Sequence, residues 1–126
     1  MFVMEKEGKE YLDWIKKAES DLRTAEKSFK INEYGWANFQ IQQSIEKALK
    51  SILIKEKEKL IKSHDLVFLS NLVKLPENLK KYCKKITLFY TLNRYPDIEG
   101  DKPNSLETKN YLQQAKEILK WVKKKI

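Results

Sequence analysis

The chain has 126 residues, of which 41% are hydrophobic and 35% charged, and its formal net charge is +8. This length suits one domain with its own core, so we expect a single domain over residues 1–126. A single cysteine excludes an intramolecular disulfide and a cysteine metal cluster, and no apolar run approaches the roughly 20 residues of a membrane span. We therefore expect a cytoplasmic protein without a membrane contact, a metal or another cofactor.

Two long helices are expected in the first half of the chain. Apolar residues recur every three or four positions over residues 5–30 and again over residues 36–57. Asn32 or Gly35 in the turn between them is suited to a left-handed helix cap. The apolar stripe expected on the second helix consists of Ile41, Ile45, Ala48, Leu49 and Ile52.

Two further helices are expected in the middle of the chain. A short helix begins at Ser63, which is a good N-cap, and Asp65 favours the positive end of its dipole. Pro76 suits the first turn of a longer helix whose apolar stripe includes Cys83, expected to be a buried and unreactive thiol. Pro96 follows the end of that helix, because the residue before a proline avoids helical geometry.

A loop over residues 94–103 and a last helix complete the chain. Asn104 and Glu107 have the spacing of a capping box, and the helix after them ends in three lysines that complement its dipole. No stretch alternates with a β period. The pattern predicts an all-α fold, an antiparallel up-and-down bundle of four main helices plus one short helix.

The positive charge favours anionic partners. The chain has 26 Lys and Arg against 18 Asp and Glu, a balance typical of proteins that bind nucleic acid, nucleotide phosphates or an acidic protein. The lysines are interleaved with glutamates along the chain, so the alternative is a solvated surface of the kind found in thermophile proteins.

Several enzyme classes are disfavoured because their motifs are missing. The sequence contains no glycine-rich phosphate loop, no G-x-x-x-x-G-K and no H-E-x-x-H. One histidine cannot build an ordinary zinc site within a single chain, and no nucleophile elbow supports a serine hydrolase. We expect no metal ligands.

A polar stripe on the second helix is the first candidate site. At 100° per residue, Gln43, Glu46, Lys47 and Lys50 lie roughly opposite the apolar stripe, with Gln42 on its flank. One interpretation is a solvated face on which Glu46 and Lys50 form an i, i+4 pair. The other is a cationic groove wall that contacts phosphate.

The second candidate is the pair His64 and Asp65 at a helix start. A helix N-terminus favours anions, and an imidazole there can contact or protonate a phosphate oxygen. The alternative is a capping arrangement in which His64 is a local hydrogen-bonding residue.

The third candidate is the segment that contains Arg94, Tyr95 and Asp97. Arg94 can bind phosphate through two hydrogen bonds, and Tyr95 and Tyr90 can stack on a base. The alternative is a salt bridge between Arg94 and Asp97 that fixes the loop, with the tyrosines packed in the core.

Together these segments resemble the HEPN family. The matching pieces are AESDL at 18–22, FQIQQSIEKALK at 39–50, HDL at 64–66 and RYPD at 94–97, and they cover nearly the whole chain in order. The resemblance implies a bundle of about five helices that is often a homodimer. It also implies a minimal nucleotidyltransferase as a partner in a toxin–antitoxin pair.

The chain departs from the family where the chemistry would be. Many HEPN proteins are metal-independent endoribonucleases that carry an Arg-x4–6-His motif at a dimer cleft, but no histidine follows Arg94 here. The only histidine, His64, lies upstream. The resemblance therefore implies His64 and Arg94 as catalytic candidates only if the fold or a dimer brings them together.

Three hypotheses follow for the function. The first is a nucleotide- or RNA-binding module that contacts phosphate through Lys47, Lys50, Arg94 and His64. The second is an active ribonuclease toxin, and the third is a non-catalytic protein-interaction subunit. One observation in the sequence itself supports homodimerisation: Trp14, Trp36 and Trp121 do not all fit inward-facing stripes. Aromatic residues that face outward often mark interfaces.

Overall fold

The structure is a computed structural model that describes residues 10–92 and 103–126. Every regular element in these two ranges is a helix. The three long helices are α2 (Glu10–Lys30), α3 (Tyr34–Lys57) and α7 (Ser105–Lys125), and the shorter ones are α4 (Leu66–Leu72), α5 (Glu77–Ile86) and α6 (Phe89–Leu92). The predicted all-α class is confirmed.

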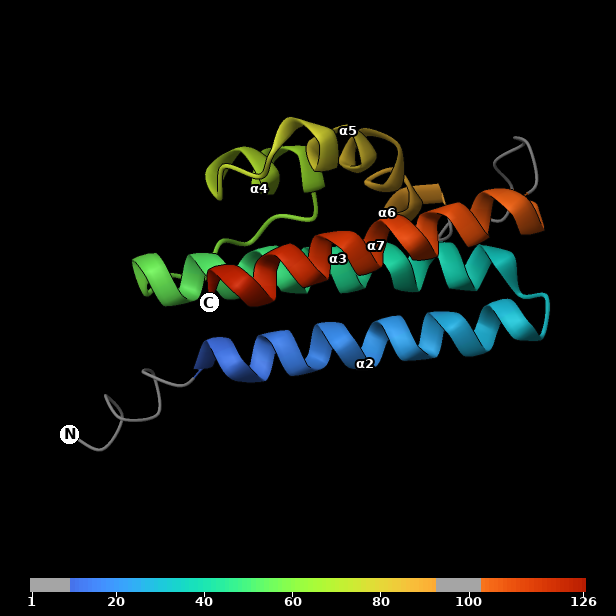
Figure 1. Ribbon diagram of the computed structural model, residues 1–126, viewed down its shortest axis with the longest axis horizontal. Helices are drawn as coiled ribbons and strands as arrows, with labels where there is room; N and C mark the ends of the chain where they lie inside the picture. Colours follow the sequence, from blue (N-terminus) through green and yellow to red (C-terminus); the bar gives the residue numbers. More distant parts are fainter. Residues whose placement is uncertain (1–9, 93–102) are drawn as a thin grey trace.

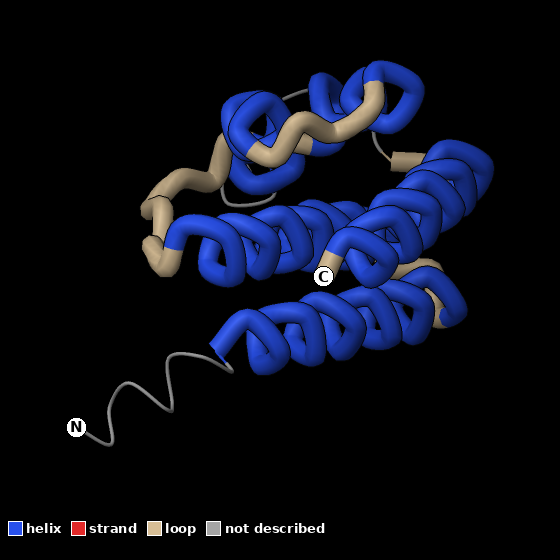
Figure 2. The backbone as a smooth tube through the Cα atoms, turned by 60° about the vertical axis from the view of Figure 1, so that its left-hand side comes forward, coloured by secondary structure: helices blue, strands red, loops and turns tan. Residues whose placement is uncertain are grey.

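Helix α3 lies at the centre of the molecule. Helices α2 and α3 run antiparallel and share the most extensive contact, and α7 packs against both of them. The short helices α4, α5 and α6 lie on the side of α3 and α7 that is turned away from α2 (Figure 1), and the rotated view agrees (Figure 2). Because α3 is covered on more than one side, it has little surface left for solvent.

One hydrophobic core joins these helices. The apolar stripe predicted for α3 is fully buried, and apolar residues of the other helices pack around it. Cys83 is buried in the same core, as predicted, and burial raises the pKa of its thiol to about 12. The buried large apolar side chains of α7 are Tyr111, Leu112, Ile118, Leu119 and Val122.

The helix ends follow the predictions in part. Asn32 has a positive φ of 63°, as expected for a left-handed cap, and α3 begins at Tyr34 instead of Trp36. The capping box is confirmed, because the Asn104 side chain accepts a hydrogen bond from the Glu107 N–H. The predicted fourth helix is divided at Thr87 into α5 and α6.

The prediction that Ser63 is the N-cap of the third helix is wrong. The N-cap of α4 is Asp65, whose carboxylate accepts hydrogen bonds from the N–H groups of Val67 and Phe68. A carboxylate also interacts favourably with the helix dipole, which a hydroxyl does not match. The Ser63 hydroxyl instead accepts from the Asp65 N–H at 3.1 Å. His64 is therefore the residue just before a capped helix, and its position is fixed by its neighbours.

Candidate functional site around His64

A line of buried polar side chains runs along α3. Gln42, Glu46 and Lys50 follow one another at four-residue steps, so they share a face of the helix, and their exposed fractions are 0%, 4% and 5%. The expectation that Glu46 and Lys50 point away from the core into solvent is wrong. The side of α3 opposite the apolar stripe is covered as well, because the segment before α4 crosses it at His64.

Glu46 and Lys50 form an ion pair inside the protein. The distance from Lys50 Nζ to Glu46 Oε2 is 2.9 Å, so the predicted i, i+4 pair exists, but in the interior. Taking two charges out of water is costly unless each is paired and hydrogen-bonded. Here the second carboxylate oxygen of Glu46 also has partners, because Gln42 Nε2 lies 3.2 Å from Oε1. The pair is therefore held in a fixed geometry by its surroundings.

His64 lies against this buried carboxylate. Its Nδ1 is 3.0 Å from Glu46 Oε1, while the side chain as a whole is 51% exposed. An ionised carboxylate only accepts hydrogen bonds, so Nδ1 carries the hydrogen and Nε2 is the nitrogen left for a ligand. Within the described part of the chain, Nε2 makes no hydrogen bond. Glu46 thus sets both the tautomer and the orientation of the ring.

The backbone of His64 is also held from two sides. Gln42 Nε2 donates to its carbonyl oxygen at 3.1 Å, and the hydroxyl of Thr87 lies 3.4 Å from the same atom. Leu66, the first residue of α4, is fully buried and donates its N–H to Thr87 Oγ1. These contacts connect α3, the start of α4 and the end of α5 at one point, and His64 stands at the surface above it.

Aromatic rings extend from His64 towards the beginning of α3. The imidazole stacks on Tyr90, with ring centroids 3.9 Å apart and an angle of 15° between the planes. Tyr90 stacks in turn on Phe39 at 6.2 Å, and Phe39 meets Trp36 edge to face at 6.1 Å. Trp36 at the far end is 55% exposed. The series begins and ends at exposed rings.

Lys47 and Lys50 are bound to different carboxylates. Lys47 forms an ion pair with Asp21 of α2, which also lies 3.7 Å from Lys17. Lys50 is buried against Glu46. The expectation that these two lysines line one open cationic wall is therefore wrong, because the wall would need both to reach solvent on the same face. Gln43 is nearer to the site, since its amide donates to Gln42 Oε1 at 2.8 Å.

The remaining predicted site residues have two different outcomes. Asp65 lies next to His64, but its carboxylate serves as the cap of α4. Arg94, Tyr95 and Asp97 lie outside the described residues, as do the expected salt bridge between Arg94 and Asp97 and the separation of Arg94 from His64.

Three contributors to the site escaped the sequence analysis in this role. Gln42 was placed on a flank, Thr87 was not considered as a partner of His64, and Phe39 was not considered as a partner of Tyr90. The sequence offers only an unspecific signal for Gln42, because residues 42, 46 and 50 are polar at four-residue steps but Gln43 and Lys47 have the same spacing. For Thr87 and Phe39 no such signal exists, because their contacts to the site depend on how separate helices pack.

Two other kinds of feature are missing from the described residues. No three His, Cys, Asp or Glu side chains in residues 10–92 and 103–126 are grouped so that they could hold a metal ion. None of the helices in those ranges has the length and apolar character needed to cross a bilayer.

Comparison with known proteins connects this geometry to a family. The HEPN domain matches residues 11–125. The crystal structure of TT1696 from Thermus thermophilus is 30% identical, with a TM-score of 0.84 over 94% of this chain and 99% of that one. The crystal structure of ST0689, described as an archaeal HEPN homologue, is 29% identical, with a TM-score of 0.78 over 91% of this chain and 96% of that one. No curated protein matches. A family match over nearly the whole chain shows that this protein belongs to the HEPN family.

Proposed function

We propose that this protein is an RNA-binding HEPN module in which His64 contacts a phosphate group. One observation carries the proposal: a half-exposed imidazole is fixed at Nδ1 by the buried carboxylate of Glu46, which leaves Nε2 for a ligand. An imidazole held in this way can donate a hydrogen bond to a phosphate oxygen when protonated and accept a proton when neutral.

The charges around His64 support an anionic ligand. Glu46 alone would repel a phosphate, but its charge is offset by Lys50 at 2.9 Å, and both side chains are buried. The net charge of the whole chain, +8, attracts polyanions over a longer range. Arg94 remains part of the proposal as a second phosphate contact, with Tyr95 and Asp97 beside it in sequence.

The aromatic series supports single-stranded RNA as the form that is bound. Bases of a single strand stack on exposed aromatic rings, and such stacking is worth about 1–3 kcal/mol per base. Trp36 is exposed at one end of the series, and the imidazole of His64 is exposed at the other. A free nucleotide is the smaller ligand of the same chemistry, with one base and one phosphate group.

Two substitutions of His64 test the phosphate contact. In His64→Gln the amide nitrogen takes the place of Nε2, whereas in His64→Asn it takes the place of Nδ1. We expect His64→Asn to weaken binding of a labelled single-stranded RNA roughly 10- to 150-fold, since a hydrogen bond to a charged group is worth about 1.5–3 kcal/mol. We expect His64→Gln to retain most of the affinity.

Fluorescence anisotropy at low salt measures both variants, with AMP as a second ligand. Equal RNA affinities of the unsubstituted protein (the parent), His64→Asn and His64→Gln would exclude the proposed contact. Lack of any RNA or AMP binding by the parent would exclude the proposed function as a whole.

A second candidate function is metal-independent RNA cleavage. The observation that favours it is the same hydrogen bond from Nδ1 to Glu46, because a general base needs a fixed tautomer. Nε2 would take the proton of a 2′-hydroxyl, whose oxygen then attacks the adjacent phosphorus. The bond to the 5′-oxygen breaks and that oxygen takes a proton from solvent, which leaves a 2′,3′-cyclic phosphate and a 5′-hydroxyl.

Incubation of RNA with excess chelator separates cleavage from binding. If the protein is a ribonuclease, products with cyclic phosphate ends accumulate, and both His64→Gln and His64→Asn abolish them because neither amide can act as a base. Intact RNA across substrates of different sequence would leave binding as the function.

We further propose that the protein forms a homodimer and pairs with a minimal nucleotidyltransferase, as the family resemblance implies. The tryptophans support a protein interface little, because Trp14 and Trp121 are half-buried and the exposed Trp36 belongs to the aromatic series proposed to bind RNA. Light scattering at micromolar concentration tests the dimer, for which a monomer mass is the contrary result. Co-purification with a nucleotidyltransferase encoded beside the gene tests the partner, and separate elution of the two proteins would exclude it.

A further inference from the structure

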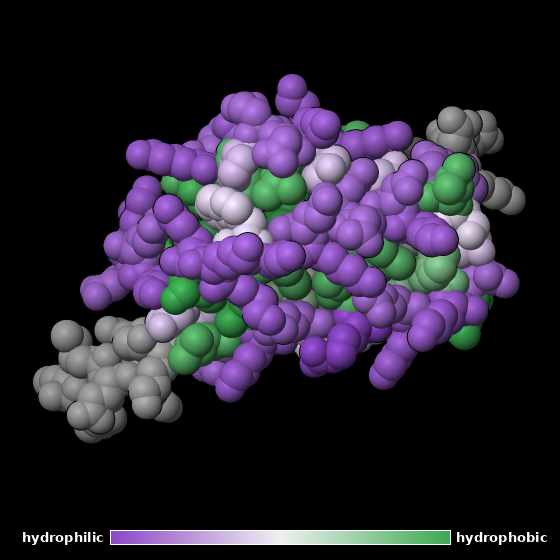
Figure 3. All heavy atoms as spheres, viewed as in Figure 1, coloured by the Kyte–Doolittle hydropathy of each residue, from purple (hydrophilic) through white to green (hydrophobic). Residues whose placement is uncertain are grey.

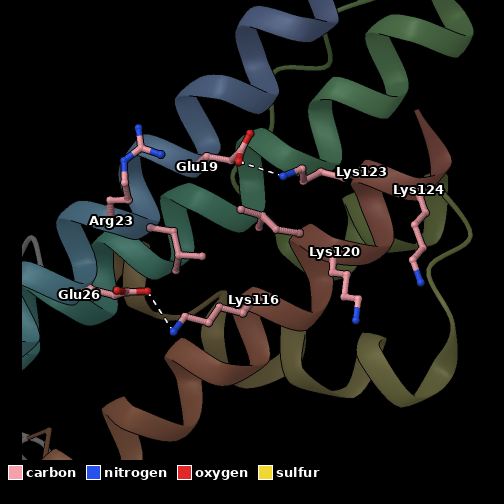
Figure 4. A pocket seen from close by; sticks show the side chains of 9 residues that line it. Glu19, Arg23, Glu26, Lys116, Lys120, Lys123 and Lys124 are labelled. Atoms are coloured by element: carbon pink, nitrogen blue, oxygen red, sulfur yellow. Dashed lines mark hydrogen bonds and ion pairs between the residues drawn. The ribbon is translucent and has the colours of Figure 1, made fainter.

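A basic groove lies between α2 and α7, away from the residues that surround His64. Its volume is about 420 Å³. Its walls carry five cationic side chains, namely Arg23 of α2 and Lys116, Lys120, Lys123 and Lys124 of α7. Figure 4 shows these residues around the seam of the two helices.

Two of the five cations are held by carboxylates across the groove. Lys116 lies 3.1 Å from Glu26, and Lys123 lies 3.1 Å from Glu19. Figure 4 shows both lysines directed towards α2, where the glutamates stand. All four side chains are about one-third exposed or more, so these pairs contribute little to stability. Their effect is to bridge the two walls.

The other three cations have no such partner. Arg23, Lys120 and Lys124 form no ion pair with any residue in the described ranges. In Figure 4, Lys120 and Lys124 extend from α7 away from the paired side chains, and Arg23 extends from α2. A surplus of three positive charges therefore stands on the two rims of the groove.

The spacing along α7 matches an extended polyanion. Residues 116 and 124 are eight positions apart, and a rise of 1.5 Å per residue separates them by about 12 Å along the helix. A nucleic-acid strand places one phosphate about every 3.4 Å of its helical axis, and further apart when it is stretched. Three phosphates can therefore lie along this wall, within reach of Arg23 on the opposite rim.

The groove has few apolar side chains, and this argues against a membrane or a hydrophobic protein partner. Its apolar side chains are Leu22 and Leu119, both buried, and none of the exposed large hydrophobic residues lines it. The face in Figure 3 is mainly hydrophilic, with hydrophobic atoms visible in the seam. Protein interfaces are usually anchored by aromatic or aliphatic side chains, whereas a phosphate backbone needs only charges.

We infer that the groove between α2 and α7 binds the sugar–phosphate backbone of single-stranded RNA without reading its sequence. The inference rests on the proposed function for the identity of the ligand, but it uses none of the residues of the His64 site. A single strand can follow a narrow cleft between two helices, whereas a duplex presents a wide, rigid surface.

A triple variant, Arg23→Gln with Lys120→Gln and Lys124→Gln, tests the groove. The dependence of affinity on salt counts the phosphates that a protein neutralises, with a slope of about −0.7 per contact for single strands. We expect the triple variant to reduce the magnitude of the slope by about 2. Between 50 and 200 mM salt the parent should then lose about 20-fold more affinity than the triple variant loses.

The matched control is Lys59→Gln with Lys74→Gln and Lys84→Gln. These three lysines are exposed, form no ion pair with another described residue and do not line the groove, so the control makes the same change in net charge. If the control reduces the slope as much as the triple variant does, net charge alone explains the binding, and the groove inference is overturned. The same holds if the triple variant leaves the slope unchanged.

The variants of His64 separate the two proposals. A slope that depends on the groove, with affinity independent of His64, would support the groove and exclude the His64 contact. A parent that binds no RNA excludes both. If polyglutamate displaces the labelled RNA as well as unlabelled RNA of equal total charge does, the groove recognises acidic protein, and the assignment to RNA is overturned.

Discussion

Helix α3 buries Ile41, Ile45 and Leu49 on one side, and Glu46 and Lys50 on another, all with exposed fractions of 5% or less. The apolar side is stabilised by removal of hydrocarbon from water, a force that has no direction and tolerates some rearrangement. The polar side is stabilised only while each group keeps its partners. The apolar side can therefore hold a helix in place, whereas the polar side can hold a single side chain, His64, in one orientation.

This difference explains why a buried ion pair stands beside a half-exposed imidazole. An isolated carboxylate under His64 would have to be desolvated without compensation. Lys50 and Gln42 supply the compensation, with distances of 2.9 and 3.2 Å to the two oxygens of Glu46. The polar side therefore costs free energy unless every buried charge keeps its hydrogen-bond and ion-pair partners. Substitutions on the apolar side and on the polar side should have distinguishable consequences.

The largest effect is expected for Glu46→Ala. It leaves Lys50 buried without its partner and removes the support of His64 Nδ1. Breaking a buried pair by removing one member costs about 3–5 kcal/mol. Chemical denaturation measures the loss in the free energy of unfolding, and Glu56→Ala on the exposed end of the same helix is the control, expected to change it little.

A double variant shows whether the cost comes from the unpaired charge. Glu46→Leu with Lys50→Met removes both charges and keeps the volume, and such replacements are often neutral or stabilising. We expect it to recover most of the loss seen in Glu46→Ala while the RNA affinity stays low, because His64 is no longer oriented. A double variant as unstable as Glu46→Ala would contradict the distinction between the two sides of α3.

A slightly smaller effect is expected on the apolar side, for Ile45→Ala. Removing this fully buried side chain should cost about 2–5 kcal/mol, depending on how far the core closes around the cavity. The folded fraction should bind RNA as the parent does, since no partner of His64 is lost. Denaturation and anisotropy at matched folded concentration test this, and a selective loss of RNA binding would show that the two sides are coupled.

The apolar side was predictable from the sequence and the polar side was not. The spacing of Ile41, Ile45 and Leu49 defines a core face at once, because periodicity reports what a helix must bury. The same periodicity assigned Glu46 and Lys50 to solvent, because it treats a helix as having one covered face. That assignment fails for a central helix that other segments cover on several sides.

The candidate site shows the same limit. His64 was found because a lone histidine before a helix is visible in any sequence, and Asn104 and Glu107 were found because a capping box is local. The contacts from Thr87 and Tyr90 to His64 join residues 23 and 26 positions apart, and no local rule specifies them. The groove between α2 and α7 joins the two ends of the chain, so its lining was equally invisible.

A smaller effect, dependent on pH, is expected for Cys83 in the apolar core. Burial raises the pKa of its thiol from 9 to about 12, so the folded state keeps a proton that the unfolded state releases between these values. Stability therefore falls as pH rises from about 9, by about 1.4 kcal/mol per pH unit for this group. The difference between the parent and Cys83→Ala in denaturation at pH 8 and pH 10 isolates it, and identical pH dependence would contradict the shift.

The smallest effect is expected where the polar side meets α4. Asp65→Ala removes the carboxylate that accepts from the N–H groups of Val67 and Phe68, which should cost about 1 kcal/mol. Ser63→Ala removes only a contact to the Asp65 N–H and should cost less. Equal losses in denaturation would mean that the two residues share the cap. If instead Asp65→Ala also weakens RNA binding, then the start of α4 positions His64 together with Glu46, and the orientation of the imidazole depends on both of its neighbours.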